Sequence, residues 1–263
     1  CAKNGFKSVV LGLSGGIDSA VCATIAVDAL GAENVFGVSM PSRYSSLGSK
    51  DDAKDLADRR GINYQVQPIE DLVTPFERQL ELSGLSAENL QARVRGVILM
   101  SLSNEHGMLT LTTGNKSELA VGYSTIYGDT VGGYAPLKDV EKSLVWNLAR
   151  WRNEYAKSRG EVEPIPASSI DKAPSAELRE NQVDQDSLPP YDVLDSILDA
   201  YINHRKSFEE IVSFGFDAEM VTKVLSMVDH AEWKRRQGAI GPKITSMAFG
   251  RDRRLPITNH YKG

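Results

Sequence analysis

The sequence predicts an α/β protein built on a doubly wound parallel sheet, with added helices toward the C-terminal end. Through residues 1–113, short apolar runs alternate with segments of helical periodicity, which is typical of parallel strands joined by crossover helices. A turn with two adjacent glycines joins the first strand to the first helix. Beyond residue 141 the segments with a clear apolar period, 141–157, 191–204 and 207–236, have helical spacing.

Four buried strands are expected, each a short apolar run bounded by glycine, proline or polar turn residues. They span residues 6–13, 34–40, 62–67 and 108–113.

Helices are expected where apolar residues recur every three to four positions. They span residues 18–30, 49–60, 74–82, 86–105, 141–157 and 191–204. Pro75 suits the first turn of its helix. Ser207 opens a capping box, and Asp217 caps a further helix that runs to about residue 236.

Two stretches have no clear period. Residues 121–135 are rich in glycine and tyrosine, and we expect them to form a loop near the site. Residues 161–190 are rich in proline and charge, and we expect a mobile segment that serves as a lid.

The composition is that of a folded, mildly acidic protein. The chain has 263 residues, 41% hydrophobic and 25% charged, with a formal net charge of −5. This balance argues against an overall nucleic-acid-binding surface, and no apolar run is long enough to cross a bilayer. Two cysteines and four scattered histidines suggest neither a disulfide framework nor a zinc site. We expect one cytoplasmic domain, residues 1–263, that binds neither membrane nor nucleic acid.

In a doubly wound sheet, ligands bind at the carboxyl ends of the strands, so the loops after residues 13, 38 and 113 are the ones to inspect. The first loop contains Ser14, Gly15, Gly16, Asp18 and Ser19. The glycines allow a tight turn, and the helix start adds partial positive charge, so the loop can cradle an anion.

The loop is neither a Walker loop nor a dinucleotide fingerprint, because neither consensus is present. An aspartate in a phosphate cradle is repulsive unless a divalent metal bridges it to the phosphates. Asp18 therefore indicates a metal. The alternative is that Asp18 only caps the helix and the glycines only form a turn.

Residues 14–19 resemble the pyrophosphate-binding loop of the N-type ATP pyrophosphatases. Further segments resemble the NAD synthetases, and in particular the synthetase portion of the glutamine-dependent ones. These segments are residues 89–95, 111–118, 121–123, 127–129, 172–178, 186–191, 232–236 and 251–254. The resemblance extends from about residue 6 to residue 261.

The resemblance implies an adenine nucleotide alpha hydrolase-like fold and an enzyme that amidates deamido-NAD to NAD. ATP adenylates the nicotinate carboxylate, ammonia displaces AMP, and pyrophosphate is released. Mg²⁺ is implied as the metal, and the assembly is expected to be a homo-oligomer. The sequence identifies no general base for the ammonia.

The resemblance also carries residues over one by one. ATP contacts are implied at Ser14, Gly15, Gly16, Asp18, Ser19, Met40, Thr113, Lys142 and Ser169, with Ser168 as the alternative to the last. Dinucleotide contacts are implied at Asn89, Arg93, Glu118, Trp233 and Lys234. The metal ligands are Asp18 and Glu118, and the catalytic residues are Asp18, Glu118 and Lys142.

Some positions depart from the pattern. Trp233 stands where the shorter, ammonia-dependent enzymes carry a histidine. Ile126 and Gly133 stand where those enzymes carry a lysine and an aspartate, so the dinucleotide contacts of those two positions are not transferred.

Plainer interpretations remain open. Glu118 suits a solvated first helical turn, Lys142 a surface lysine and Arg93 a partner for a nearby acid. GMP synthetase is an alternative activity. Residues 207–236 could instead form a helix-turn-helix that binds DNA, with a basic end at 234–236.

Cys1 could be the N-terminal nucleophile of an amidotransferase. The glycine turn follows it too closely to leave room for a glutaminase domain. We therefore expect the chain to be the synthetase part of a longer protein, with the glutaminase domain elsewhere in that protein.

Overall fold

Four parallel strands form the sheet of this protein, which a computed structural model describes for residues 1–258. The spatial order is β3-β2-β1-β4. The strands are β1 (Val9–Gly12), β2 (Val35–Ser39), β3 (Asn63–Val66) and β4 (Leu109–Thr110). The doubly wound α/β class is confirmed. The end of the expected resemblance, up to residue 261, lies outside the described residues.

The strand order places a crevice at β1. Because β1 pairs with β2 on one side and with β4 on the other, the chain winds away from β1 and later returns to its opposite edge. The loops that follow β1 and β4 therefore diverge from adjacent carboxyl ends. Such a switch point is where open α/β sheets bind ligands.

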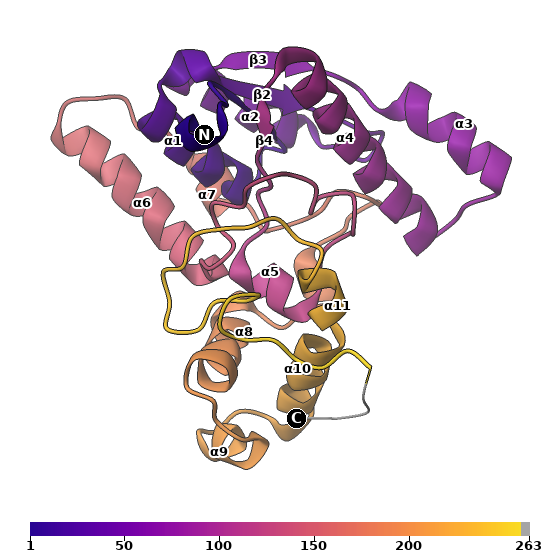
Figure 1. The fold of residues 1–263 in the computed structure, drawn as a ribbon, viewed down its shortest axis with the longest axis vertical. Coiled ribbons are helices and arrows are strands. Elements are labelled where there is room, and N and C mark those ends of the chain that lie inside the picture. Colours follow the sequence, from indigo (N-terminus) through magenta and orange to yellow (C-terminus); the bar gives the residue numbers. More distant parts are fainter. Residues whose placement is uncertain (259–263) are drawn as a thin grey trace.

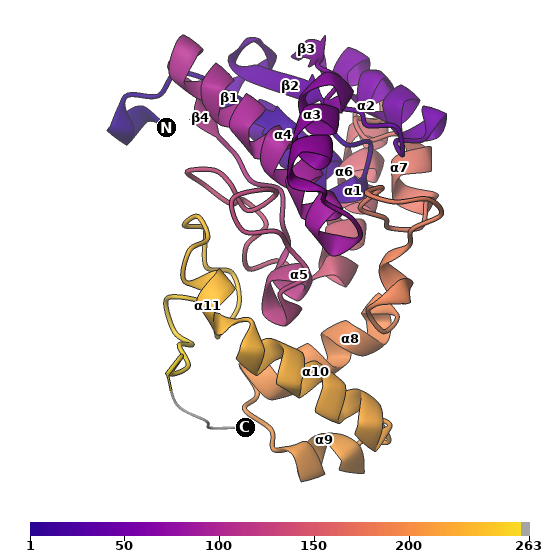
Figure 2. The ribbon, with the colours of Figure 1, turned by 90° about the vertical axis from the view of Figure 1, so that its right-hand side faces the viewer.

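Helices cover both faces of the sheet (Figures 1 and 2). One face carries α1 (Ile17–Leu30), α2 (Leu47–Arg60), α6 (Lys142–Ser158) and α7 (Ala167–Asp171), and the other carries α3 (Glu70–Leu80) and α4 (Leu85–His106). The alternation along β1 explains the two layers, because successive side chains of a strand point to opposite faces. Val9 and Leu11 pack with α1, whereas Val10 packs with α4.

A second core lies below the sheet, in the C-terminal helices (Figure 1). It is formed by α5 (Lys116–Val121), α8 (Tyr191–Leu198), the π-helical turn η4 (Asp199–Asn203), α9 (Phe208–Ser213) and α10 (Ala218–His230), and α11 (Glu232–Arg235) packs beside α5 and α10. Short 3₁₀ turns are η1 (Ala2–Asn4), η2 (Ala32–Asn34) and η3 (Asp184–Asp186). The helix α5 belongs to this core and directly follows the loop after β4, so it joins the two layers to the C-terminal helices.

Several predicted boundaries were wrong. The helix predicted at 74–82 begins at Glu70, with Glu70 and Asp71 in its first turn, so Pro75 lies inside it. The strand predicted at 108–113 pairs regularly only over β4. Beyond it, the amide of Thr112 donates to the carbonyl of Tyr134 (3.0 Å) rather than to β1.

The helix predicted to run unbroken to residue 236 ends at His230, and α11 follows it after Ala231. Arg235 explains the break, because its guanidinium donates to the carbonyls of Ala120 (2.6 Å) and Val228 (2.7 Å). The helix predicted at 191–204 becomes a π-helical turn from Asp199 onward. Within residues 1–258, no helix is long and apolar enough to cross a membrane.

Candidate functional site

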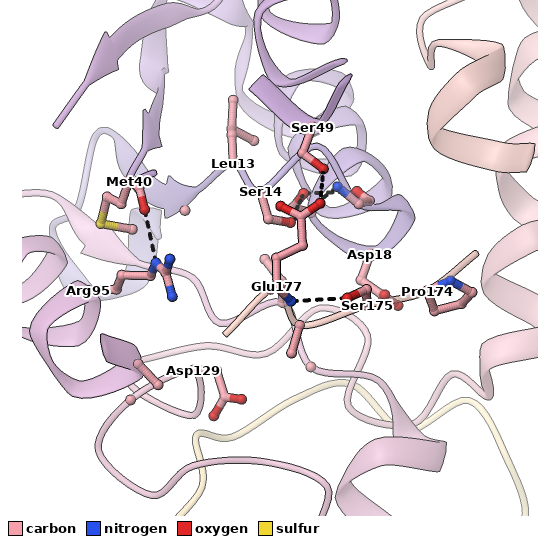
Figure 3. A pocket seen from close by; sticks show the side chains of 18 of the residues that line it. Leu13, Ser14, Asp18, Met40, Ser49, Arg95, Asp129, Pro174, Ser175 and Glu177 are labelled. Carbon is pink, nitrogen blue, oxygen red and sulfur yellow. Dashed lines mark hydrogen bonds between the residues drawn. The ribbon is translucent and has the colours of Figure 1, made fainter. Parts of the chain in front are cut away.

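A cavity of about 300 Å³ opens where β1, β2 and β4 end (Figure 3). Every residue predicted to contact ATP lines it except Gly15. The lining includes Ser14, Gly16, Asp18, Ser19, Met40, Thr113, Glu118, Lys142 and Ser169. Side chains predicted from separate sequence segments are thus brought to one place. Between the two serines left open, Ser169 lines the cavity, while the hydroxyl of Ser168 donates to Asp52.

The glycine turn packs directly on α2. Gly15 has φ +80°, and a Cβ there would lie 2.1 Å from the backbone oxygen of Ser49. Its own carbonyl accepts a hydrogen bond from Ser169 (3.1 Å). Only glycine satisfies both constraints, the left-handed backbone and the close approach.

The N-terminus of α1 lies in the cavity wall. Gly16 is the N-cap of this helix and provides no side-chain cap. A helix N-terminus without a cap leaves backbone N–H groups unpaired, and its dipole favours an anion. This arrangement is suited to a phosphate group of a nucleotide.

Three charged side chains meet beside this turn. The Nζ atom of Lys142 donates to Asp18 and lies 3.5 Å from Oε1 of Glu118. The Lys142 side chain is only 2% exposed, and its ammonium lies 5.6 Å from the ring centroid of Trp146 and 5.3 Å from that of Tyr191. Lys142 is therefore a buried partner of both carboxylates rather than a surface lysine.

Asn115 links the carboxylates from the back. This fully buried side chain donates through Nδ2 to Asp18 (3.0 Å) and accepts through Oδ1 from the amide of Glu118 (2.9 Å). The Glu118 carboxylate accepts in return from the amide of Asn115 (3.3 Å), which completes a capping box at α5. Sequence reasoning missed Asn115, although an asparagine three residues before a glutamate is the available signal.

The trio places two carboxyl groups against one ammonium. Burial, and then the charge of Asp18, raise the pKa of Glu118 to about 8, although Lys142 opposes them. Burial alone would lower the pKa of Lys142, but Asp18 and Glu118 outweigh it and raise that pKa above its ordinary value. Nearby, burial also raises the pKa of Asp184, which accepts from the hydroxyl of Tyr191 (2.7 Å).

The pair of carboxyl groups, Asp18 and Glu118, fits a divalent cation. Asp18 and Glu118 both contact one ammonium group, so their oxygens lie close enough to share an ion. No cluster of three or more histidine, cysteine, aspartate or glutamate side chains suited to a metal occurs in the described part of the chain. Two carboxylates with substrate phosphates and water are the ligands that Mg²⁺ commonly uses.

The other predicted dinucleotide contacts do not line the cavity. Asn89 accepts from the hydroxyl of Thr125 (2.7 Å), and Arg93 donates to the carbonyl of Ile126 (3.2 Å). Lys234 donates to the carbonyls of Gly122 (2.7 Å) and Ser124 (2.8 Å), and Trp233 is 47% exposed. Three of these four side chains hold the loop predicted at 121–135.

The segment predicted as a lid forms one wall of the cavity. Residues 172–178 line it, and Glu177 accepts from the hydroxyls of Ser46 (2.8 Å) and Ser49 (2.7 Å) at the start of α2. Lys172 pairs with Asp52 (2.8 Å). The wall is therefore fastened to the helix against which Gly15 packs.

Arg95 is a cavity residue to which the sequence reasoning gave no role. Its Nε donates to the carbonyl of Met40 (3.0 Å), as Figure 3 shows. Burial lowers the pKa of this guanidinium to about 10, and within residues 1–258 it forms no ion pair. The only available signal was its place in the segment 89–95.

Comparison with known proteins identifies the family. Residues 1–238 match the family described as NAD synthase. The chain belongs to the NAD synthase family. It is 53% identical to the glutamine-dependent NAD(+) synthetase of Xanthomonas campestris pv. campestris, over all of this chain and 48% of that protein. The chain thus spans about half the length of the curated relatives it matches.

Solved structures of related synthetases have the same fold as this chain. A glutamine-dependent NAD+ synthetase from Acinetobacter baumannii, in complex with ADP, is 49% identical with a TM-score of 0.63, covering 98% of this chain and 47% of that one. An NMN synthetase from Francisella tularensis is 27% identical with a TM-score of 0.75, covering 93% of this chain and 92% of that one. The expected adenine nucleotide alpha hydrolase-like fold is confirmed.

The DNA-binding alternative finds no support in this geometry. A DNA reader needs basic side chains free to contact phosphates. The ammonium of Lys234 donates to backbone carbonyls, and Arg235 and Arg236 both pair with Glu232 (3.0 and 2.6 Å). GMP synthetase is likewise disfavoured, because the family matched is NAD synthase.

Proposed function

We propose that this chain catalyses the ATP-dependent amidation of deamido-NAD to NAD, with AMP and pyrophosphate as the other products. The observation that carries the proposal is the convergence of Asp18, Glu118 and Lys142 beside the Gly15–Gly16 turn. Membership of the NAD synthase family supplies the substrate class. The ADP bound by the Acinetobacter relative supports a nucleotide in the cavity.

In the first step, an oxygen of the nicotinate carboxylate attacks the α-phosphorus of ATP. The bond from that phosphorus to the bridging oxygen breaks, and pyrophosphate leaves. Ser14, Ser19 and the uncapped start of α1 hold the phosphates, which fixes the line of attack. Lys142 places positive charge where negative charge gathers on the leaving group.

In the second step, ammonia attacks the acyl carbon of the adenylate, the bond from that carbon to the AMP oxygen breaks so that AMP leaves, and the nitrogen releases one proton to solvent. Neither step needs a covalent bond to the protein. The work of the chain is to align two anionic substrates and to balance their charge.

Asp18 and Glu118 would hold Mg²⁺ in this scheme. When bound, the ion neutralises charge on the triphosphate and on the departing pyrophosphate. Asn115 orients both carboxylates from behind. The ammonium of Lys142 offsets part of their negative charge. The dinucleotide is proposed to reach Glu118 past the loop that Asn89, Arg93 and Lys234 hold, with Trp233 exposed beside it.

The nitrogen donor is proposed to be free ammonium or ammonia from a glutaminase domain in the same protein. The relatives named glutamine-dependent, of which the chain covers about half, support the second source. We also propose that residues 161–190 act as a lid, that the protein is a homo-oligomer and that it works in the cytoplasm. Light scattering measures the assembly directly, and a monomer would contradict that part of the proposal.

A direct assay tests the function. The chain is incubated with ATP, Mg²⁺ and ammonium, with either deamido-NAD or its nicotinate mononucleotide half as the acceptor. We expect NAD, AMP and pyrophosphate in equal amounts, with deamido-NAD as the better acceptor. ADP as the product contradicts the chemistry, and preference for the mononucleotide contradicts the substrate.

A binding assay tests the alternative class. A DNA reader binds duplex DNA with an affinity that falls steeply as salt increases. We expect no such binding, and a steep salt dependence would count against the proposal.

A further inference from the structure

Asp195 is a buried carboxylate that lies outside the cavity and connects three helices. It lies on α8 and is 4% exposed. One of its oxygens accepts from the hydroxyl of Ser117 on α5, and the other accepts from the amide of Ser143 on α6 (2.8 Å). Within residues 1–258, it forms no ion pair.

These contacts cap α6 from outside. Glu141, the N-cap of α6, makes no side-chain cap of its own, although the first amides of a helix need acceptors. The amide of Lys142 donates to the hydroxyl of Ser117 (2.9 Å), and the next amide donates to Asp195. Ser117 and Asp195 together supply the missing cap.

The two helix starts so connected carry two members of the charged trio, Glu118 and Lys142. Ser117 precedes Glu118 in α5, and Ser143 follows Lys142 in α6. Fixing these two backbone segments against one carboxylate fixes the distance between the Glu118 and Lys142 side chains. Burying a carboxylate without a cation partner costs free energy, so packing alone does not account for an aspartate between these helices. An apolar residue would suffice if packing were the only requirement.

We propose that Asp195 is a positioning residue for the adenylation step, acting through Ser117 and Ser143 to set the separation of Glu118 from Lys142. This inference rests on the proposed function. Asp195 does not touch the substrates. Its effect is on the alignment of the groups that do, so its loss should slow the chemistry while nucleotide binding persists.

The test measures deamido-NAD-dependent exchange of labelled pyrophosphate into ATP. Asp195→Asn keeps the shape of the side chain but replaces one acceptor by a donor. We expect kcat for exchange to fall by about 10- to 100-fold, since small misplacements cost that much, with the KM for ATP within about threefold of the original. Asp192→Asn is the matched control, because it removes a carboxylate from an exposed position of the same helix, and its kcat should stay within about twofold.

Ser117→Ala provides a second variant, since it removes the shared hydroxyl and leaves the carboxylate in place. We expect the same loss of kcat, smaller in size, and a double variant no worse than Asp195→Asn alone, because both act through one connection. Circular dichroism reports whether each variant is folded. If Asp195→Asn does not fold, Ser117→Ala decides the question.

Three results would overturn the proposal. They are an unchanged kcat in a folded variant, a raised KM for ATP with kcat preserved, or an equal loss in Asp192→Asn. The unsubstituted chain separates this outcome from failure of the proposed function. If that chain exchanges no pyrophosphate and forms no NAD, the function is wrong, whereas a normal chain with an unaffected Asp195→Asn refutes only the positioning role.

Discussion

Lys142 and Asp18 form an ion pair in the wall of the cavity, although one begins α6 and the other lies in the first turn of α1. The pair exists because α1 and α6 pack side by side on the same face of the sheet. Glu118 joins the pair from α5, 3.5 Å from the same ammonium. The charge balance of the site therefore depends on how three helices pack.

Replacing Lys142 with methionine removes the only cation of the trio while keeping most of its volume. We expect NAD formation to fall by at least about 100-fold, and the free energy of unfolding to fall by about 3 kcal/mol because two carboxylates lose their partner. Assays of product formation and urea unfolding measure the two effects.

The double variant Asp18→Asn with Lys142→Met should be less destabilised than the sum of the single variants, since both break one pair. Lys206→Met serves as the control, because it removes a partly exposed lysine that pairs with a surface glutamate, Glu210. Additive effects would show that the two side chains do not interact.

Gly15→Ala should damage both stability and nucleotide binding. The new Cβ would lie 2.1 Å from the backbone oxygen of Ser49, and φ +80° is unfavourable for alanine. We expect a loss of about 2 kcal/mol or more in the free energy of unfolding, and weaker ATP binding by calorimetry.

Gly48→Ala, in α2, is the matched control. A Cβ there meets nothing within 4 Å, and alanine is the better helix former by about 1 kcal/mol. This variant should be slightly more stable than the original chain. A Gly15→Ala chain that melts at the same temperature as Gly48→Ala would contradict the close packing of Gly15 on Ser49.

The raised pKa of Glu118 predicts that the stability of the ligand-free chain depends on pH. Its pKa is raised to about 8, first by burial and then by Asp18, whereas an unfolded glutamate titrates near about 4.3. A raised pKa means that Glu118 keeps its proton to a higher pH in the folded state than in the unfolded state. The stability that this proton contributes is therefore present below about pH 4 and is lost as the pH rises toward 8.

Glu118→Gln should remove that slope. Between pH 6 and pH 8 we expect the original chain to lose roughly 1–2 kcal/mol relative to the variant, measured by urea unfolding at each pH. Parallel stability curves for the two chains would contradict a raised pKa. The variant should also fail to form NAD at every pH.

Lys234→Met tests the predicted dinucleotide contact. Lys234 holds the carbonyls of Gly122 and Ser124 but does not line the cavity. We expect the KM for deamido-NAD to rise by about tenfold, equivalent to about 1.4 kcal/mol, while the KM for ATP changes little. Lys223→Met, which removes an exposed lysine of α10, is the control. An equal rise in both KM values would assign Lys234 to the general fold instead.

The sequence allowed the sheet and the glycine turn to be predicted, because local rules govern both. Alternating apolar runs and helical spacing indicate strands and helices, and Gly15 and Gly16 indicate a tight turn. The errors at Pro75 and at the break after His230 arose where long-range contacts override local preference. Arg235, for example, reaches carbonyls in two other elements.

Family resemblance placed Asp18, Glu118 and Lys142 in one site, but their arrangement could not be read from the chain. Their neighbours were harder still. Asn115 orients Asp18 and Glu118 from behind the cavity and Arg95 lines it, and the sequence signals for them, a helix cap and a place in the segment 89–95, do not specify these contacts.

The sequence by itself determined a doubly wound α/β protein with an anion-binding turn after its first strand, since periodicity and glycine chemistry act over a few residues. Only the tertiary structure decided which side chains share the cavity. The order β3-β2-β1-β4 brings the ends of β1 and β4 together, and Asp195 ties the starts of α5 and α6 to α8. These relationships arise from packing between distant segments, where burial makes each charge and hydrogen bond depend on neighbours that the local sequence does not specify.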